Sequence, residues 1–164
     1  MTLSPLPKKV TDEIRHILEG IKSGRLEHVQ GEFHCGSAHC VAGWYVVLNA
    51  QKLGLVYIPE DETFEPSDPE ADTDPDCWDI ARENWGLTPA ESAILFLWNA
   101  ALDIQFALLE YLESGQRVWT KHANYMYCYT DEGVGLALLD TDENTRIDSP
   151  FLQFLEKRKA KEQS

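Results

Sequence analysis

The six residues "GLTPAE", from Gly86 to Glu91, constrain the fold more than any other stretch of the chain. Thr88 is a favoured N-cap residue, Pro89 suits the first helical position, and Glu91 stands three residues after the cap, which completes a capping box. Gly86 closes the preceding helical pattern, because glycine readily adopts the left-handed conformation that ends many helices. The stretch therefore predicts two consecutive helices joined by a tight turn.

Apolar side chains at helical spacing predict further helices on both sides of this turn. Residues 11–23 carry isoleucine and leucine at that spacing, with Thr11 as the N-cap and Gly24 just past the end. Residues 37–52 are densely apolar and are closed by Gly54, which predicts a helix buried on most sides. The same criteria predict helices over residues 76–85, over residues 89–100 and, capped by Asp103, over residues 104–114.

The hydrophobic period changes in the C-terminal third of the chain. Tyrosine occupies every second position of residues 125–129, residues 131–133 carry a turn signal, and residues 134–141 can return as a partner strand. This pattern predicts a β-hairpin. A short helix capped by Ser149 is expected to follow it and to fray into a basic tail.

The length of 164 residues and the hydrophobic content of 43% are typical of a single globular domain with one core. The predicted fold class is α+β, a mostly helical single domain over residues 1–164 with a C-terminal β-hairpin. Its parts are a helical core with an acidic loop, the hairpin, and a C-terminal helix with its basic tail. The helical core spans residues 11–115 and contains the acidic loop at residues 59–76. The hairpin spans residues 116–148, and the C-terminal helix with its tail spans residues 149–164.

The charge of the chain disfavours two classes of partner. With 28 acidic and 14 basic residues, the net charge is −14, and such a surface repels nucleic-acid phosphates and anionic membranes. No stretch approaches the roughly 18 apolar residues of a membrane span, and the first residues lack the apolar centre of a signal peptide. We therefore expect a cytoplasmic protein that binds neither nucleic acid directly nor a membrane.

The acidic run at residues 59–76 contains four prolines and no lysine or arginine, which predicts an exposed loop. Carboxylates and aromatic rings close to it form a candidate docking surface for a basic protein partner, because protein interfaces are enriched in aromatic residues. The alternative is that the rings pack in the core. The candidate partner-binding residues are Trp78, Trp85, Asp72, Asp74 and Asp76.

A cluster of cysteine and histidine in "FHCGSAHCVAGW", residues 33–44, raises the question of a metal site. Helical spacing would bring Cys35 and His39 onto one face, and zinc takes four nitrogen or sulfur ligands. Further ligands would have to come from Cys77, Cys128 or His122. The candidate metal ligands are Cys35, His39, Cys40 and Cys77.

Other interpretations of this cluster compete with zinc. A disulfide between Cys35 and Cys40 is disfavoured in a reducing cytoplasm. A cysteine nucleophile with a histidine base lacks a third residue that orients the base. The spacing contains no second pair of closely spaced cysteines, and we favour a helix start in which Cys40 packs as a small hydrophobic residue.

The segment "CGSAHCVAGW", followed by Ala81 and "GLTPAESAILF", resembles an uncharacterised family of small bacterial and phage proteins. In that family a Cys-Gly-(Ser/Thr)-x-x-Cys-x-Ala-Gly-Trp motif precedes an Ala…Leu-Gly-Leu-Thr…Leu-Phe helical pair. The resemblance covers residues 33–97, and Trp85 replaces a common leucine. It implies a shared structural unit and no particular activity. The unit comprises Cys35, Gly36, Ser37, Cys40, Ala42, Gly43 and Trp44.

Paired catalytic carboxylates, a phosphate-binding glycine loop and a nucleophile motif are not found in the sequence. We therefore expect a non-enzymatic interaction or regulatory protein that docks on a basic protein and requires no cofactor. The alternative is a protein with a Cys/His site, either a structural zinc or a reactive thiol, built around residues 34–40.

Overall fold

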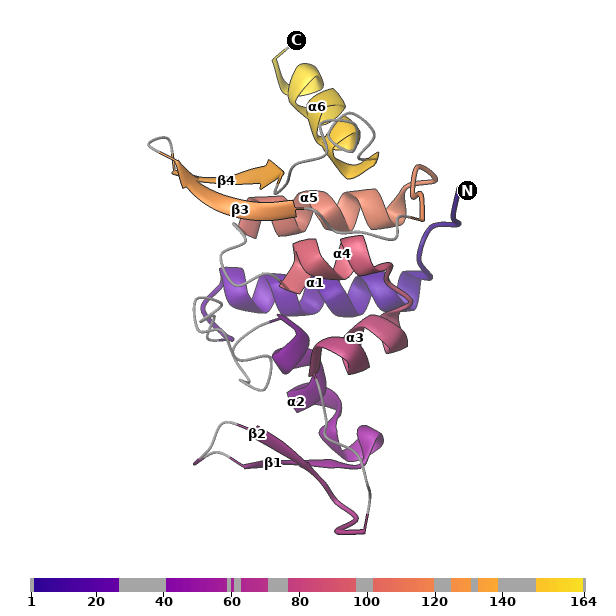
Figure 1. Cartoon of the computed structure of the whole chain (residues 1–164), viewed down its shortest axis with the longest axis vertical. Helices are drawn as coiled ribbons and strands as arrows, with labels where there is room; N and C mark the ends of the chain where they lie inside the picture. The colour runs from indigo at the N-terminus through magenta and orange to yellow at the C-terminus, as the bar shows by residue number, and fades with distance from the viewer. Residues whose placement is uncertain are drawn as a thin grey trace.

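The computed structural model describes residues 2–26, 41–58, 60, 63–70, 77–96, 102–119, 125–130, 133–138 and 150–163. These residues are mostly helical, as the sequence predicts (Figure 1). The helices are α1 (Lys8–Lys22), α2 (Val41–Leu53), α3 (Cys77–Trp85), α4 (Pro89–Phe96), α5 (Leu102–Glu113) and α6 (Pro150–Glu162). The strands are β1 (Leu55–Ile58), β2 (Thr63–Pro66), β3 (Tyr125–Thr130) and β4 (Gly133–Leu138).

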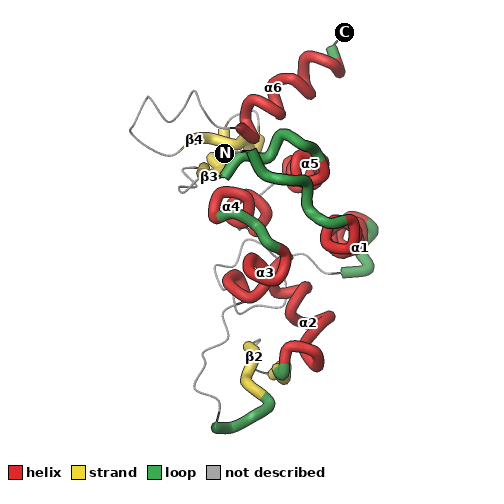
Figure 2. Tube along the Cα trace, turned by 90° about the vertical axis from the view of Figure 1, so that its right-hand side faces the viewer, coloured by secondary structure: helices red, strands yellow, loops and turns green. Residues whose placement is uncertain are grey.

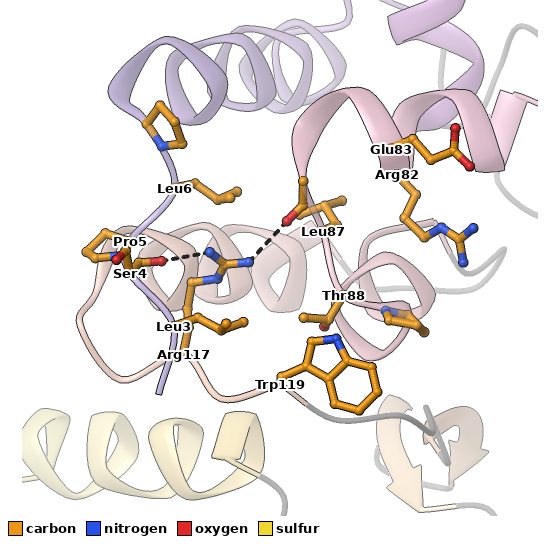
Figure 3. A pocket seen from close by; sticks show the side chains of 13 residues that line it. Leu3, Ser4, Pro5, Leu6, Arg82, Glu83, Leu87, Thr88, Arg117 and Trp119 are labelled. Carbon is orange, nitrogen blue, oxygen red and sulfur yellow. Dashed lines mark hydrogen bonds between the residues drawn. The ribbon is translucent and has the colours of Figure 1, made fainter. Parts of the chain in front are cut away.

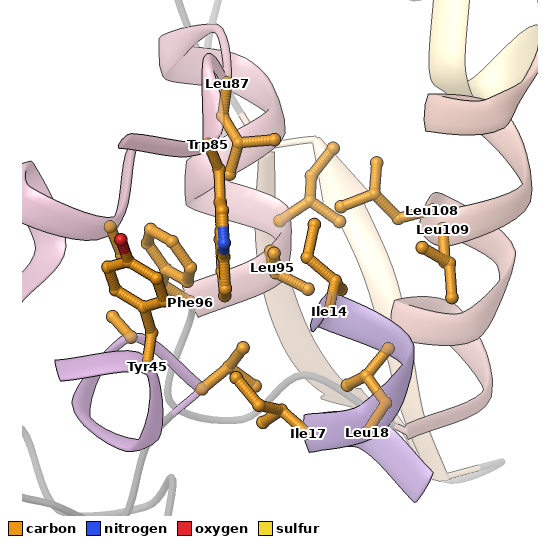
Figure 4. Packing of buried hydrophobic residues seen from close by; sticks show 14 of the residues in the cluster. Ile14, Ile17, Leu18, Tyr45, Trp85, Leu87, Leu95, Phe96, Leu108 and Leu109 are labelled. Atoms are coloured by element: carbon orange, nitrogen blue, oxygen red, sulfur yellow. The ribbon is translucent and has the colours of Figure 1, made fainter. Parts of the chain in front are cut away.

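The core lies between α1, α4 and α5, with α2 and α3 packed beside it (Figures 1 and 2). Figure 4 shows how Ile14, Ile17 and Leu18 of α1 meet Leu95 of α4 and Leu108 of α5. These five side chains are completely buried or nearly so. Each such side chain contributes about 1.5–3 kcal/mol by leaving water, so the apolar spacing of the helices accounts for their packing.

Strands β1 and β2 form an antiparallel hairpin at one end of the long axis of the molecule, beyond α2 (Figure 1). Leu55 lies opposite Pro66 and Tyr57 lies opposite Phe64, whose ring centroids are 5.1 Å apart. The prediction of a loop over residues 59–76 is therefore wrong for Thr63–Pro66. Phe64 explains the difference, because its buried ring joins the core and holds β2 against β1.

At the other end of the molecule, α6 packs against α5 through the buried side chains of Phe151 and Leu155 (Figure 1). The helix extends through Lys157–Lys161, which the sequence predicted to fray. In the second small sheet, β3 pairs antiparallel with β4 from Tyr125 opposite Leu138 to Thr130 opposite Gly133.

Two predicted N-caps are wrong. Thr11 lies one turn inside α1, where its hydroxyl donates to the carbonyl of Lys8, and Pro7 occupies the cap position. Asp103 lies in the first turn of α5 rather than before it, because the helix already begins at Leu102. In both places the helix begins earlier than the cap signal. At α1 the first residues are the exposed Lys8 and Lys9, and Pro7, whose ring fixes φ, stands at the cap.

The turn between α3 and α4 has the predicted geometry. Gly86 adopts a φ of +72° after the last residue of α3. The hydroxyl of Thr88 accepts the N–H of Glu91 at 3.2 Å, and the Glu91 carboxylate accepts the N–H of Thr88 at 2.8 Å. The capping box is thus confirmed with both of its hydrogen bonds.

The carboxylate of Glu91 also binds the guanidinium of Arg117 in a buried, bidentate ion pair. Arg117 Nε donates to Glu91 Oε2 at 2.8 Å, and Nη2 donates to Oε1 at 2.7 Å. The same guanidinium donates to the carbonyls of Ser4 and Gly86 (Figure 3). Arg117 therefore ties the N-terminal segment, the α3–α4 turn and the residues after α5 together.

The N-terminal segment, residues 2–7, is fixed by backbone hydrogen bonds to the same region. The N–H of Leu3 donates to the carbonyl of Arg117 at 2.7 Å, and the N–H of Leu6 donates to that of Leu112 at 3.0 Å. Thr2 pairs with Val118 in an isolated antiparallel bridge. The segment thus closes one side of the helical body.

We expect Arg117→Met to destabilise the fold by about 3–5 kcal/mol, because it leaves the Glu91 carboxylate buried without its counter-charge. The double variant Arg117→Met/Glu91→Gln removes both charges and keeps a residue that can form the capping box, so it should lose less. Urea unfolding measures the free energy of unfolding of both variants.

Arg82→Met, which breaks an exposed pair with Asp79, is the control and should lower the free energy of unfolding by less than about 1 kcal/mol. A loss for Arg117→Met as small as that of the control would contradict this role.

Stability should also fall at alkaline pH. Burial, reinforced by Glu13, raises the pKa of Tyr45 above its usual value of 10.0. Burial likewise raises the pKa of Tyr111. The hydrogen bond from the Val118 N–H and the charge of Arg117 lower this pKa, but the effect of burial is larger. The folded state then holds protons that the unfolded state releases. The stabilisation is complete below pH 10.0 and is lost as the pH rises through the folded pKa.

Chemical unfolding of the wild type and of Tyr45→Phe between about pH 8 and pH 11 tests this expectation. The variant should lose less stability over this range, because it lacks one of the two phenols, Tyr45 and Tyr111, whose raised pKa is described above. Equal losses for the two proteins would show that Tyr45 makes no contribution.

Candidate functional site

The β1–β2 hairpin and the turn that follows it present a row of carboxylates to solvent. Residues 55–70 are called the acidic hairpin here, and among those that the structure describes the exposed acidic side chains are Glu60, Glu65, Asp68 and Glu70. These carboxylates form no ion pair with any residue that the structure describes. Their negative charge is therefore uncompensated within this part of the chain.

The two faces of the acidic hairpin differ in chemistry. Tyr57 and Phe64 share the face that packs toward the body, while Val56 and Glu65 lie opposite each other and point to the other face. Val56 is 48% exposed. The outer face thus combines an apolar contact with negative charge.

Local hydrogen bonds hold the end of the acidic hairpin in shape. The carboxylate of Asp68 accepts the N–H of Glu70 at 3.0 Å, which is the geometry of an Asx turn. The N–H of Ser67 donates to the carbonyl of Gly54 at 2.8 Å and extends the pairing beyond the strands. The carboxylates of this turn are therefore arranged before any partner binds, which reduces the entropy lost on binding.

The two tryptophans predicted to dock on a partner, Trp78 and Trp85, are partly and almost completely buried, respectively. Trp85 is only 2% exposed and packs between Tyr45 and Phe96, with ring centroids 4.7 and 6.1 Å away. Its assignment to a docking surface is therefore wrong, because a buried ring cannot meet a partner (Figure 4). Trp78 is partly buried, donates to the hydroxyl of Ser92 at 3.3 Å and meets Phe96 edge-on.

The remaining predicted partner-binding residues, Asp72, Asp74 and Asp76, lie outside the described residues, and so do the candidate ligands Cys35, His39 and Cys40. Cys77 begins α3 and is completely buried in the core. In the described ranges, no group of three or more histidine, cysteine, aspartate or glutamate side chains could hold a metal ion.

Trp119 is an exposed aromatic residue that does not belong to the candidate partner-binding residues. It is 49% exposed and stands at the rim of a pocket of about 570 Å³ between the N-terminal segment and the α3–α4 turn (Figure 3). Leu3, Thr88 and Arg117 also line this pocket. Because the guanidinium of Arg117 already binds Glu91 and two carbonyls, the pocket wall is part of the structural core of the fold.

Among the described residues, the helices are too short or too polar to cross a membrane. Comparisons of the chain with family models, curated proteins and solved structures found no match. The function must therefore be inferred from the chemistry of the chain itself.

The buried thiol of Cys77 should be protected from reagents in the folded protein. Alkylation with iodoacetamide, followed by peptide mass spectrometry, should leave Cys77 unmodified under native conditions and modify it fully in denaturant, because its side chain has no exposed surface. Rapid modification of Cys77 in the native protein would show that the start of α3 opens readily.

Proposed function

We propose that this protein is a non-enzymatic interaction protein that docks its acidic hairpin on a basic surface of a partner protein. The observation that carries the proposal is the set of exposed carboxylates on the hairpin at one end of the molecule, which form no ion pair with the residues that the structure describes (Figures 1 and 2). A surface of this kind attracts basic proteins over distances of about a Debye length, roughly 8 Å at physiological ionic strength.

The arrangement of the acidic hairpin favours a specific contact over general solubility. Val56 lies beside Glu65 on the outer face, so that a partner can cover an aliphatic side chain while its cations meet the carboxylates. Protein interfaces commonly combine an apolar centre with a polar rim. The charges then accelerate and orient the encounter, and the apolar contact adds to its lifetime.

Retention of partner proteins from cells that make this protein tests the proposal. The triple variant Glu60→Gln/Glu65→Gln/Glu70→Gln removes three of the six acidic charges of the acidic hairpin and leaves Asp68, which holds the turn, unchanged. We expect a partner retained by the wild type to bind the variant at least about tenfold more weakly, as the loss of several charge contacts predicts.

The matched control is Glu19→Gln/Glu83→Gln/Glu156→Gln, which removes the same charge from exposed positions on α1, α3 and α6. The control should retain the partner as well as the wild type does. Equal retention by both variants, or the absence of any retained protein, would contradict the proposal.

A further inference from the structure

The pocket between the N-terminal segment and the α3–α4 turn has a mostly apolar wall and an exposed rim. Its volume is about 570 Å³, and three prolines, Pro5, Pro7 and Pro89, line it. Pro5 and Pro7 are exposed, and the indole of Trp119 stands at the rim (Figure 3). Ligand pockets commonly have volumes of about 300–1,000 Å³ and apolar walls with a few polar groups. The pocket therefore has the size and lining of a binding site.

Three side chains of this pocket have a hydrogen-bond donor without an acceptor among the described residues. The buried hydroxyl of Thr88 accepts the N–H of Glu91 but donates its own proton to none of them. A guanidinium has five N–H groups, and that of the buried Arg117 forms four hydrogen bonds, which leaves one N–H of Nη1. The indole N–H of Trp119 likewise donates to none of these residues. The pocket can therefore donate to the acceptors of a ligand.

The charges around the pocket favour an uncharged ligand. Two cations line it, and each is already paired with a carboxylate: Arg82 with Asp79 at 3.2 Å, and Arg117 with Glu91 at 2.7 Å. The exposed Glu83 also lines the pocket and would repel an anion. Neutral carbonyl oxygens are therefore better suited to these donors than carboxylates or phosphates.

The chain's own N-terminal segment provides an example of such an acceptor. Arg117 Nη1 donates at 2.8 Å to the carbonyl of Ser4, the residue directly before Pro5 (Figure 3). The segment ends at Pro7, whose φ of −56° and ψ of 143° lie in the polyproline II region. A carbonyl that precedes a proline in an extended segment is thus already bound by this guanidinium.

A second proline-rich segment would match the remaining features of the pocket. The carbonyls of a polyproline II helix form no internal hydrogen bonds, and proline has no N–H that would lose its partner on binding. Such helices dock their rings on aromatic side chains, and they are stiff, so that little entropy is lost. The buried ion pair of Arg117 with Glu91 holds the pocket wall in place before the ligand arrives.

We propose that this pocket binds an extended, proline-rich segment of another protein. The proline rings pack on the indole of Trp119, and the carbonyls of the segment accept from Thr88 and Arg117. The acidic hairpin contributes no residue to the pocket, so this inference does not depend on the proposed function.

Titration of the ¹⁵N-labelled protein with octaproline, blocked at both ends, tests the inference. The indole N–H signal of Trp119 is identified as the one that is missing from the spectrum of Trp119→Phe. This signal and the backbone N–H signals of residues 86–88 should shift as octaproline is added, with a dissociation constant of about 1 mM or below. A blocked glycine–serine peptide of the same length has carbonyls but no rings, and it should cause no such shift.

Two substitutions of Trp119 separate the contribution of the ring from that of its donor. Trp119→Ala should weaken octaproline binding at least about tenfold, because it removes the aromatic surface. Trp119→Phe keeps a ring without the N–H and should bind with an affinity between those of Trp119→Ala and the wild type. Leu48→Ala is the matched control, because Leu48 is 48% exposed, close to the 49% of Trp119, and lies on α2 outside the pocket. It should bind octaproline like the wild type.

An unchanged spectrum at about 10 mM octaproline would overturn the inference. Equal binding by Trp119→Ala, shown by circular dichroism to be folded, would also overturn it, and so would equal binding of the glycine–serine peptide. The variant Glu60→Gln/Glu65→Gln/Glu70→Gln should bind octaproline like the wild type. If this variant is folded and no longer binds the peptide, the peptide lies on the acidic hairpin and the inference is wrong. None of these results affects the retention experiment that tests the proposed function.

Discussion

The buried ion pair between Glu91 and Arg117 is the interaction on which the rest of the fold depends. Glu91 caps α4 through the N–H of Thr88 and at the same time neutralises Arg117. The remaining donors of the guanidinium satisfy the carbonyls of Ser4 and Gly86, which no regular secondary structure could pair. Burial of two charges is favourable only when the geometry is good, and the two hydrogen bonds of this pair, at 2.8 and 2.7 Å, meet that condition.

The sequence predicts those features that local signals determine. The capping box of α4 and the glycine that ends α3 are visible in six consecutive residues, and both have the predicted geometry. Long-range partners leave no local signal. Nothing around Arg117 indicates that it binds a carboxylate 26 residues away. The predicted N-cap of α1 is also wrong, because the helix begins at Lys8, directly after Pro7, and Thr11 lies inside it.

The candidate site, too, could be predicted from the sequence only in part. The abundance of acids in residues 59–76 is evident from composition, whereas β2 is not, although Phe64 is the only aromatic residue in that run and marks the strand. Trp85 shares a helix face with Cys77 and Ala81, and this spacing already indicated that its ring would be buried.

The hydrogen bond from Arg117 to the Ser4 carbonyl joins residues that are 113 positions apart in the chain. A contact of such length carries a large loop-closure cost, so it forms after the helices have assembled. We therefore expect the N-terminal segment to dock late in folding. Interactions that form after the transition state mainly govern the rate of unfolding, so this segment should affect the unfolding rate more than the folding rate.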